Sequence, residues 1–254
     1  MSNKDTSSRV AIQETYPIPG YAVYGGEIPK DFTIRAMTTV EEKLRLAGTG
    51  FEVIPQLIKA CTVSPEDVDI SELKLFDIQF LMYKLRIITY GPDYKLHLTC
   101  PHCGKEFDIT LDLDELECTE IPEDFEEPFE IGPLPISGDI LTCKILNIQE
   151  YLDIIKEAKR IKNKNPNYVG DPEFILNYQY QIIAINGKDD LKPFEKRQYV
   201  ESMHARDLRY LDSNYVDKTA GYGLDTAIFE LCPHCEGEIT FDLPVTEEFF
   251  RPTY

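Results

Sequence analysis

The tetrapeptide Cys100-Pro101-His102-Cys103 occurs a second time in the chain, as Cys232-Pro233-His234-Cys235. Both copies lie between short stretches that predict strands, at residues 96–99, 106–111, 227–231 and 238–243. A Cys-x-x-Cys turn between two strands is typical of a zinc knuckle, because one tight turn then presents two thiolates to a tetrahedral metal ion. A structural zinc ion needs four ligands, and one knuckle supplies two. The two motifs therefore predict one shared site, closed across 128 intervening residues.

The expected metal ligands are Cys100, Cys103, Cys232 and Cys235, and the expected cofactor is a single structural Zn²⁺. Iron also binds four thiolates, but zinc is the commoner occupant at this hairpin geometry. The histidines inside the two turns are expected to point away from the metal and to cap the turn or hydrogen-bond a sulfur. Cys-Pro-His-Cys also occurs in oxidising thioredoxin-fold enzymes, where the first cysteine starts a helix. Strand patterns follow both motifs here, which disfavours a thiol oxidoreductase.

Length and composition limit the classes of protein that this chain can be. Its 254 residues, 43% of them hydrophobic, can form one large domain or two small ones. No run of 18 apolar residues predicts a membrane span, and the polar residues 1–9 lack the apolar core of a signal peptide. We therefore expect no membrane association and a protein that stays where it is made. Seven cysteines, four in paired turns, fit a reducing compartment with metal better than a disulfide framework.

The net charge of −19 makes direct binding to nucleic acid an unfavoured function, because a chain this acidic repels phosphates. Between Lys105 and Lys144 there is no Lys or Arg, whereas thirteen Asp and Glu fall in that interval. The one basic cluster, at residues 156–164, overlaps the end of an amphipathic run. We interpret this cluster as the solvated face of a helix end rather than as a nucleic-acid footprint.

The order of predicted elements indicates an internally duplicated α+β fold, in which a shared zinc ribbon joins two halves. Each half reads as a strand, a capped helix, a further helix, a Tyr-Gly pair and a knuckle hairpin. Thr39 and Asn147 are the expected N-caps. The expected segments are an extended N-terminal arm (1–31), a first helical half with a knuckle (32–113), an acidic Pro-rich connector (114–138), a second helical half with a knuckle (139–245) and a C-terminal tail (246–254). The connector is expected to be poorly packed.

Apolar residues that return at three- and four-residue steps predict helices at residues 73–88, 148–161, 173–185 and 194–211. Pro172 and Pro193 are well placed to open the last two of these helices. Aromatic residues gather near both chain ends, where they either pack on their own domain or dock onto a partner. The sequence leaves these two readings open.

No catalytic constellation is recognisable, and we expect a protein without enzymatic activity. The chain has no Gly-rich phosphate loop, no His-Glu-x-x-His and no Gly-x-Ser-x-Gly. The carboxylate pairs Glu126-Glu127 and Asp189-Asp190 are expected to be solvated, and His97 and His204 to be structural. Three cysteines lie outside the motifs. We expect Cys61 and Cys143 to be small buried hydrophobes, and Cys118 to be an exposed thiol whose acidic neighbours disfavour the thiolate.

Several motifs together resemble a known family. They are a capped helix at Thr38-Thr39-Val40-Glu41-Glu42, an Asp-led helix from Asp77 to Arg86 that ends in Tyr90-Gly91, and the first knuckle with Gly104 after it. This layout is similar to that of the baseplate hub assembly proteins of contractile-tailed, T-even-like bacteriophages. The resemblance covers residues 32–113 best and residues 139–245 more weakly, and only the Cys-Pro-His-Cys elements are specific.

The resemblance implies a non-enzymatic protein that acts in tail baseplate assembly or stays in the virion. It implies other tail or baseplate proteins as partners, and the host cytoplasm or the virion tail baseplate as the location. Two alternatives stay open at this point: a zinc-ribbon regulator or nucleic-acid-associated module, and a thiol oxidoreductase.

Overall fold

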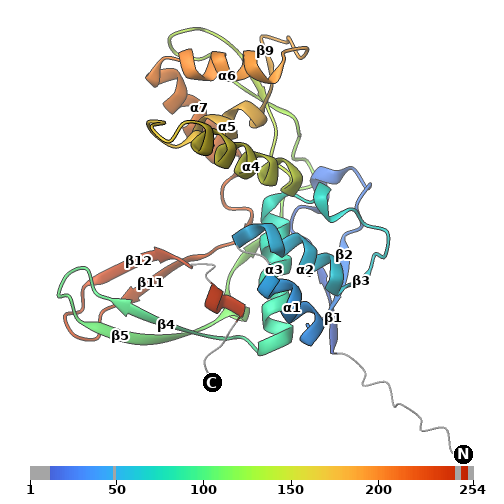
Figure 1. Cartoon of the computed structure of the whole chain (residues 1–254), viewed down its shortest axis with the longest axis vertical. Helices are drawn as coiled ribbons and strands as arrows, with labels where there is room; N and C mark the ends of the chain where they lie inside the picture. Colours follow the sequence, from blue (N-terminus) through green and yellow to red (C-terminus); the bar gives the residue numbers. More distant parts are fainter. Residues whose placement is uncertain (1–11, 48–49, 244–246, 251–254) are drawn as a thin grey trace, which may run out of the picture.

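The computed structural model describes residues 12–47, 50–243 and 247–250. Figure 1 shows two bodies, one above the other, and a long arm that projects sideways from the lower one. The lower body is formed mainly by the first half of the chain, and the upper body by residues that follow the first knuckle. The arm consists of two β-hairpins from distant parts of the sequence.

The first body packs three α-helices against a three-stranded antiparallel sheet. Its strands and helices are β1 (Gln13–Pro17), β2 (Asp31–Arg35), β3 (Thr62–Ser64), α1 (Thr39–Ala47), α2 (Ile54–Cys61) and α3 (Leu75–Tyr90). Short 3-10 helices are η1 (Tyr21–Tyr24), η2 (Gly50–Val53), η3 (Ile70–Glu72) and η4 (Leu113–Glu115). Helix α3 is buried on most of its sides, since the consecutive residues Phe80, Leu81, Met82 and Tyr83 are all buried, and it runs through the largest core of the molecule. The C-terminal η5 (Glu247–Phe250) adds Phe249 to this core.

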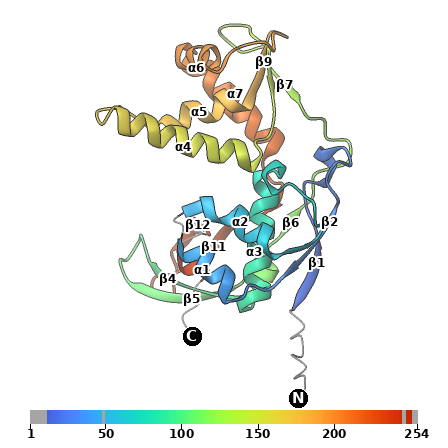
Figure 2. The same cartoon turned by 45° about the vertical axis from the view of Figure 1, so that its right-hand side comes forward.

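The second body repeats the combination of a three-stranded antiparallel sheet with helices. Its elements are β7 (Phe129–Ile131), β8 (Leu141–Cys143), β9 (Ile182–Ile185), α4 (Ile148–Lys164), α5 (Pro172–Gln181), α6 (Pro193–Ser202) and α7 (Ala205–Thr219). Figure 2 shows α4 as the part of this body that lies across the top of the first body. The chain enters through β6 (Cys118–Thr119) and leaves through β10 (Gly223–Leu224), and these two strands pair with each other.

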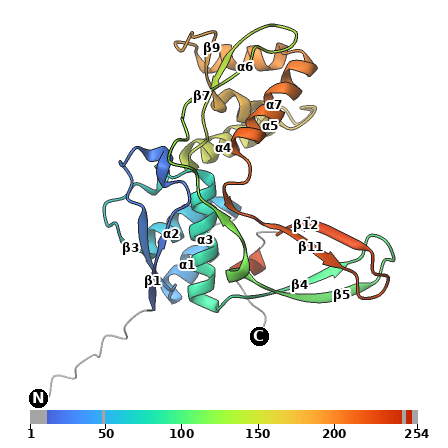
Figure 3. The same cartoon turned by 180° about the vertical axis from the view of Figure 1, so that it is seen from behind.

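The arm is made of the hairpins β4–β5 (Asp93–Thr99 and Glu106–Asp112) and β11–β12 (Ala227–Leu231 and Glu238–Asp242). They run side by side to a common tip in the views of Figure 1 and Figure 3. Within both hairpins exposed residues alternate with more buried ones, as expected for a strand with one covered face. The strands around each knuckle are therefore confirmed. The fold is mixed α+β, with seven α-helices among the described residues.

Several expected boundaries differ from the structure. The helix expected at 173–185 ends at Gln181, because the next four residues form β9 instead. The helix expected at 194–211 is two helices, separated where Met203 and His204 adopt extended backbone angles. His204 caps the second of these, since its Nδ1 accepts the backbone N–H of Arg206 at 3.1 Å.

The expectation of a poorly packed connector at residues 114–138 is wrong. Ile121, Phe129, Ile131 and Leu134 are each at most 6% exposed and form part of the core of the second body. The described part of the expected N-terminal arm also belongs to a folded body, since β1 pairs with β2 and Ile18 is fully buried. At the chain ends, Phe32, Phe249 and Phe250 are buried in the first core, so these aromatics pack on their own domain. Tyr254 lies outside the described residues.

The capping of α1 differs from expectation by one residue. Thr38, not Thr39, is the cap: its Oγ1 accepts the backbone N–H of Val40, and its own N–H donates to Glu41. In α4 the expected cap Asn147 is confirmed, and it forms a reciprocal capping box with Glu150. Among the described residues, no helix is both long and apolar enough to cross a membrane.

A pH-dependent loss of stability is expected for Glu41→Gln. The Arg35 guanidinium at 2.8 Å, together with donors from Thr38, lowers the pKa of Glu41 to about 2. A carboxylate with a lowered pKa stabilises the fold above its usual pKa of 4.5 and loses that contribution as the pH falls toward 2. We expect Glu41→Gln to cost roughly 1.5–3 kcal/mol at pH 7 and progressively less below pH 4.5. Urea unfolding of both proteins at pH 7 and pH 3 measures this, and equal stability at pH 7 would contradict it.

Candidate metal centre

The tip of the arm brings together the four cysteines of the two Cys-Pro-His-Cys motifs. Their Sγ atoms all lie within 4.8 Å of one another. Two contacts cross between the hairpins: Cys100 Sγ lies 3.7 Å from Cys235 Sγ, and Cys103 Sγ lies 3.8 Å from Cys232 Sγ. The inner cysteines Cys100 and Cys232 are 1% exposed, whereas the other two are exposed. The two half-sites therefore form one cluster, in which each sulfur faces a sulfur of the other hairpin.

The two knuckle turns have the same local hydrogen bonds. In the first, Cys100 N–H donates to Lys105 O and Gly104 N–H donates to Cys100 O. In the second, Cys232 N–H donates to Gly237 O and Glu236 N–H donates to Cys232 O. The backbone N–H of the enclosed histidine points at the first sulfur of each turn, at 3.4 Å in both cases. Each turn thus presents a pair of sulfurs, and the first sulfur of each pair accepts a backbone N–H.

The geometry fits a tetrahedral metal ion. Zinc–sulfur bonds of about 2.3 Å at tetrahedral angles place neighbouring sulfurs about 3.8 Å apart, and the two contacts between hairpins are 3.7 and 3.8 Å. Four soft sulfur donors select zinc or iron rather than magnesium or calcium. When bound, such an ion would contribute a structural cross-link between the hairpins.

The electrostatics of the cluster also favour a cation. Burial acts to raise the pKa of Cys100, but hydrogen bonds from the N–H groups of Cys103 and His102 and from the side chains of Cys232 and Cys103 together outweigh it and lower this pKa to about 6. The pKa of Cys235 instead rises to about 12: an N–H bond from Gly237 lowers it, but partial desolvation and the three neighbouring sulfurs together outweigh that bond. Four sulfurs at this distance cannot all be ionised unless positive charge balances them.

The ring of His102 makes a contact between the two knuckles. The sequence predicts a hydrogen bond within its own turn, whereas the structure places the ring against the other hairpin. Its Nε2 lies 2.9 Å from the backbone oxygen of Glu238 in the other hairpin. The ring passes so close to Gly237 that a Cβ at that position would lie 2.6 Å from its Cδ2 and 3.3 Å from Cys235 Sγ. Glycine is therefore required by close packing of one knuckle on the other. The spacing of the cysteines alone gave no sign of this, because the contact depends on how the hairpins meet.

Gly237→Ala is expected to destabilise the arm by about 1–3 kcal/mol, the usual cost of overpacking. The new methyl group would displace the His102 ring and break its bond to Glu238 O. Chemical denaturation of the metal-loaded protein measures the effect. His102→Ala removes the clash, so adding Gly237→Ala to that variant should change its stability much less. An equal loss in both backgrounds would show that the ring contact is not the cause.

The remaining cysteines lie away from the cluster. Cys61 and Cys143 are fully buried, as expected for small hydrophobes, and burial raises the pKa of Cys61 to about 11 and that of Cys143 to about 12. Cys118 is exposed, as expected. The pKa of Cys118 is raised first by desolvation and then by Glu120 and Asp77. The acidic neighbours therefore act as expected, but they are not the main cause.

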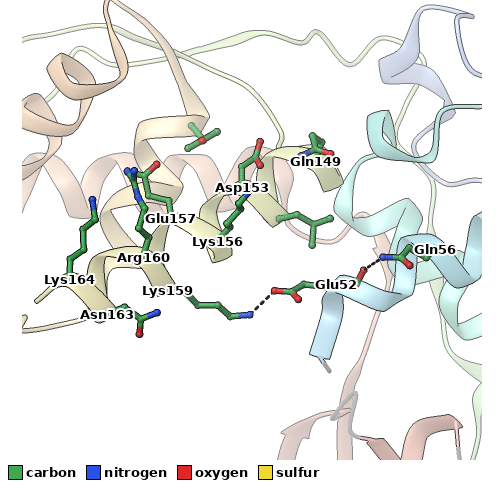
Figure 4. Close-up of a pocket in the computed structure, with 12 residues that line it drawn as sticks. Glu52, Gln56, Gln149, Asp153, Lys156, Glu157, Lys159, Arg160, Asn163 and Lys164 are labelled. Atoms are coloured by element: carbon green, nitrogen blue, oxygen red, sulfur yellow. Dashed lines mark hydrogen bonds and ion pairs between the residues drawn. The ribbon is translucent and has the colours of Figure 1, made fainter. Parts of the chain in front are cut away.

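The basic cluster at residues 156–164 occupies the C-terminal part of α4, where it lines a pocket between the two bodies (Figure 4). Lys159 reaches across this pocket to Glu52 of the first body, at 2.6 Å. Arg160 pairs with Glu157, and Lys162 pairs with Asp171. These ion pairs neutralise much of the positive charge of the cluster.

His97 lies on β4, away from this cluster. It contacts the carboxylate of Asp108 at 2.7 Å, and this contact raises the pKa of the His97 imidazole.

The redox geometry expected of a thioredoxin-like motif is not present at either knuckle. Strands β5 and β12 follow the two motifs, so neither first cysteine lies at the start of a helix.

The carboxylate pair Glu126-Glu127 departs from expectation, because Glu127 is not solvated. Its side chain is 9% exposed and pairs with Lys74 at 2.9 Å.

Comparison with known proteins identifies the family. No curated protein and no solved structure matches the chain. The family model described as T4 bacteriophage base plate protein matches residues 25–251, which include both knuckles, the second body and the first body from β2 onward. The match extends well beyond the first half, where the sequence resemblance was strongest. The chain belongs to the T4 bacteriophage base plate protein family.

Proposed function

We propose that this protein is a non-enzymatic structural or assembly component of the phage tail baseplate, stabilised by one structural Zn²⁺. The proposed ligands are Cys100, Cys103, Cys232 and Cys235. The observation that supports the metal most directly is the convergence of four sulfurs from hairpins that lie far apart in the sequence. The family supports the role in the baseplate and the other baseplate proteins as partners.

Zinc at this site would act as a staple between the two halves of the chain. Beneath the sulfurs the hairpins share a small apolar cluster, made of Ile239 with Phe107 and Phe241. A core of this size contributes little, whereas a structural zinc site supplies roughly 10–16 kcal/mol of apparent binding free energy. The metal would therefore hold the arm together, and the surfaces fixed by the arm and bodies would carry the function.

The test of this role asks whether the chain is present in phage particles or in the intermediates of tail assembly isolated from infected host cells. Mass spectrometry of purified virions and of tail-assembly intermediates should find the chain in at least one of them. A phage with an early stop codon in this gene should accumulate incomplete tails. Absence of the chain from both fractions, with normal tails in the mutant, would contradict the proposal.

We also propose that the two halves are related by internal duplication. The order β1-β2-α1-α2-β3-α3-β4-β5 in the first half parallels β7-β8-α4-α5-β9-α6-α7-β11-β12 in the second. Both sheets have the same strand order, and both middle strands carry an irregularity, at Thr33/Ile34 and at Thr142/Cys143. At the end of each middle strand, a basic residue pairs with the third residue of the following helix: Arg35, the last residue of β2, pairs with Glu41, and Lys144, the residue after β8, pairs with Glu150.

Two buried aspartates support the same relationship. Asp77 and Asp207 are each the third residue of the helix that precedes a knuckle hairpin, and both are at most 1% exposed. Asp77 accepts the backbone N–H of Gly20 at 2.7 Å, and Asp207 accepts that of Ile136 at 2.7 Å. These donors follow the matching segments Pro17-Ile18-Pro19 and Pro133-Leu134-Pro135. A shared tertiary hydrogen bond of this kind is specific, because each partner is remote in sequence from the other.

A further inference from the structure

One face of the β11–β12 hairpin carries large exposed apolar side chains. Phe229 is 58% exposed and Leu231 is 54% exposed, and Ala227 lies on the same face. The intervening residues Ile228 and Glu230 lie on the other face and are less exposed. Single exposed apolar residues are ordinary on a protein surface, but two on one side of one strand form a continuous patch. We call this patch, Ala227 with Phe229 and Leu231, the β11 face.

The other knuckle hairpin shows that a zinc knuckle does not need this face. When the two Cys-Pro-His-Cys motifs are aligned, Ala227, Phe229 and Leu231 correspond to Lys95, His97 and Thr99 of β4. Those residues are also exposed, and they are polar. Both hairpins have the same alternation and the same turn hydrogen bonds. The apolar character of the β11 face is therefore not explained by the fold of the hairpin.

The surroundings of the β11 face are acidic. Glu238, Thr240 and Asp242 of β12 lie directly opposite Leu231, Phe229 and Ala227 on the same side of the hairpin. Residues 224–243 contain five Asp and Glu and no Lys or Arg. A second copy of this chain would bring the same acidic rim and another net charge of −19 to the contact, and repulsion would oppose it. Charge complementarity instead favours a partner with basic residues around an apolar depression.

We propose that the β11 face is a docking surface for another baseplate protein, which receives Phe229 and Leu231 in an apolar depression rimmed by Lys or Arg. This inference rests on the proposed function, because the partner is sought among baseplate proteins. The anchor residues are aromatic and aliphatic, and acidic side chains surround them, as in protein interfaces with an apolar centre and a polar rim.

The test places a photo-crosslinking phenylalanine analogue at position 229 of the full chain, expressed in infected host cells. We expect crosslinks to a baseplate protein other than this one, at a peptide that contains Lys or Arg beside apolar residues. The same analogue at position 97, the matched place on the first hairpin, serves as the control and should give far fewer crosslinks. Equal yields at both positions, crosslinks to a second copy, or no crosslink in particles that contain the chain would overturn the docking surface.

The matched variant is Phe229→His with Leu231→Thr, which copies the polar face of the first hairpin. It should keep the metal content and the unfolding transition of the parent, and its affinity for the crosslinked protein should fall at least about tenfold. Unchanged affinity would overturn the inference. The proposed function fails separately: a chain that is absent from baseplate particles but still crosslinks through position 229 to a basic protein would retain the docking surface and lose the baseplate role.

Discussion

Cys232→Ser is expected to reduce the zinc content of the purified protein from one ion per chain to near zero. The four Sγ atoms form one cluster, with contacts of 3.7 and 3.8 Å between hairpins, so removal of one sulfur breaks the only set of four ligands that the described residues bring together. Two independent knuckles would instead lose one half of the metal. Elemental analysis of the purified variant distinguishes these outcomes, and a full equivalent of zinc in Cys232→Ser would exclude the shared site.

The same variant should lose much of the stability of the arm. A structural zinc site supplies roughly 10–16 kcal/mol of apparent binding free energy, which rivals the net stability of ~5–15 kcal/mol of a typical domain. We expect faster amide hydrogen exchange in β4, β5, β11 and β12, and a chelator should produce the same change in the parent. Cys118→Ser is the control, because Cys118 is an exposed cysteine outside the cluster. It should retain both the metal and the exchange protection.

The knuckles could be predicted from sequence because their geometry is local. A Cys-x-x-Cys turn and its flanking strands are specified within about a dozen residues, and two incomplete half-sites imply that they meet. The way in which the two hairpins pack on each other could not be predicted from the sequence. The fit of His102 against Gly237 depends on the approach of two segments that are remote in the chain.

Helix starts show how far local rules reach. Asn147 is followed three residues later by Glu150, which makes one capping box possible, and the structure contains it. In the first half, Thr38 with Glu41 and Thr39 with Glu42 satisfy the same rule. The structure uses the first pair, Thr38 with Glu41, and Glu41 also forms an ion pair with Arg35 of β2. A capping rule considers only residues at the start of the helix, so it does not include a partner on a strand.

The missed strand and the packed connector have a related cause. Residues 182–185 continue the apolar pattern of the helix before them, and a short apolar run does not distinguish helix from strand. β9 forms because it pairs with β8, which lies some forty residues earlier. The connector is rich in acid and proline, which favours disorder locally, but its few apolar residues are enclosed by helices that come much later in the chain. Composition describes a segment and not the surface that covers it.

Glu127→Ala is expected to destabilise the protein by about 3–5 kcal/mol, the cost of removing one partner from a buried ion pair. The Lys74 and Glu127 side chains are 13% and 9% exposed and lie 2.9 Å apart. Lys74 Nζ also donates to Ile145 O, and Glu127 Oε1 accepts the N–H of Ile145 at 2.6 Å. Removal of the carboxylate would leave the Lys74 ammonium group without its counter-charge and the Ile145 N–H without an acceptor. Denaturant unfolding measures the loss, and Glu126→Ala, an exposed neighbour, should change stability by no more than about 0.5 kcal/mol.

The position of this pair explains why its loss should affect more than local stability. Lys74 precedes α3 of the first body, whereas Ile145 precedes α4 of the second, and Ile148 N–H donates to Leu73 O beside them. The pair therefore joins the two bodies. Lys74→Met combined with Glu127→Leu removes both charges, and it should recover part of the stability lost in Glu127→Ala. Hydrogen exchange at the Ile145 and Ile148 amides should increase in Glu127→Ala. Unchanged exchange at these amides would show that Glu127 does not stabilise the contact between the two bodies.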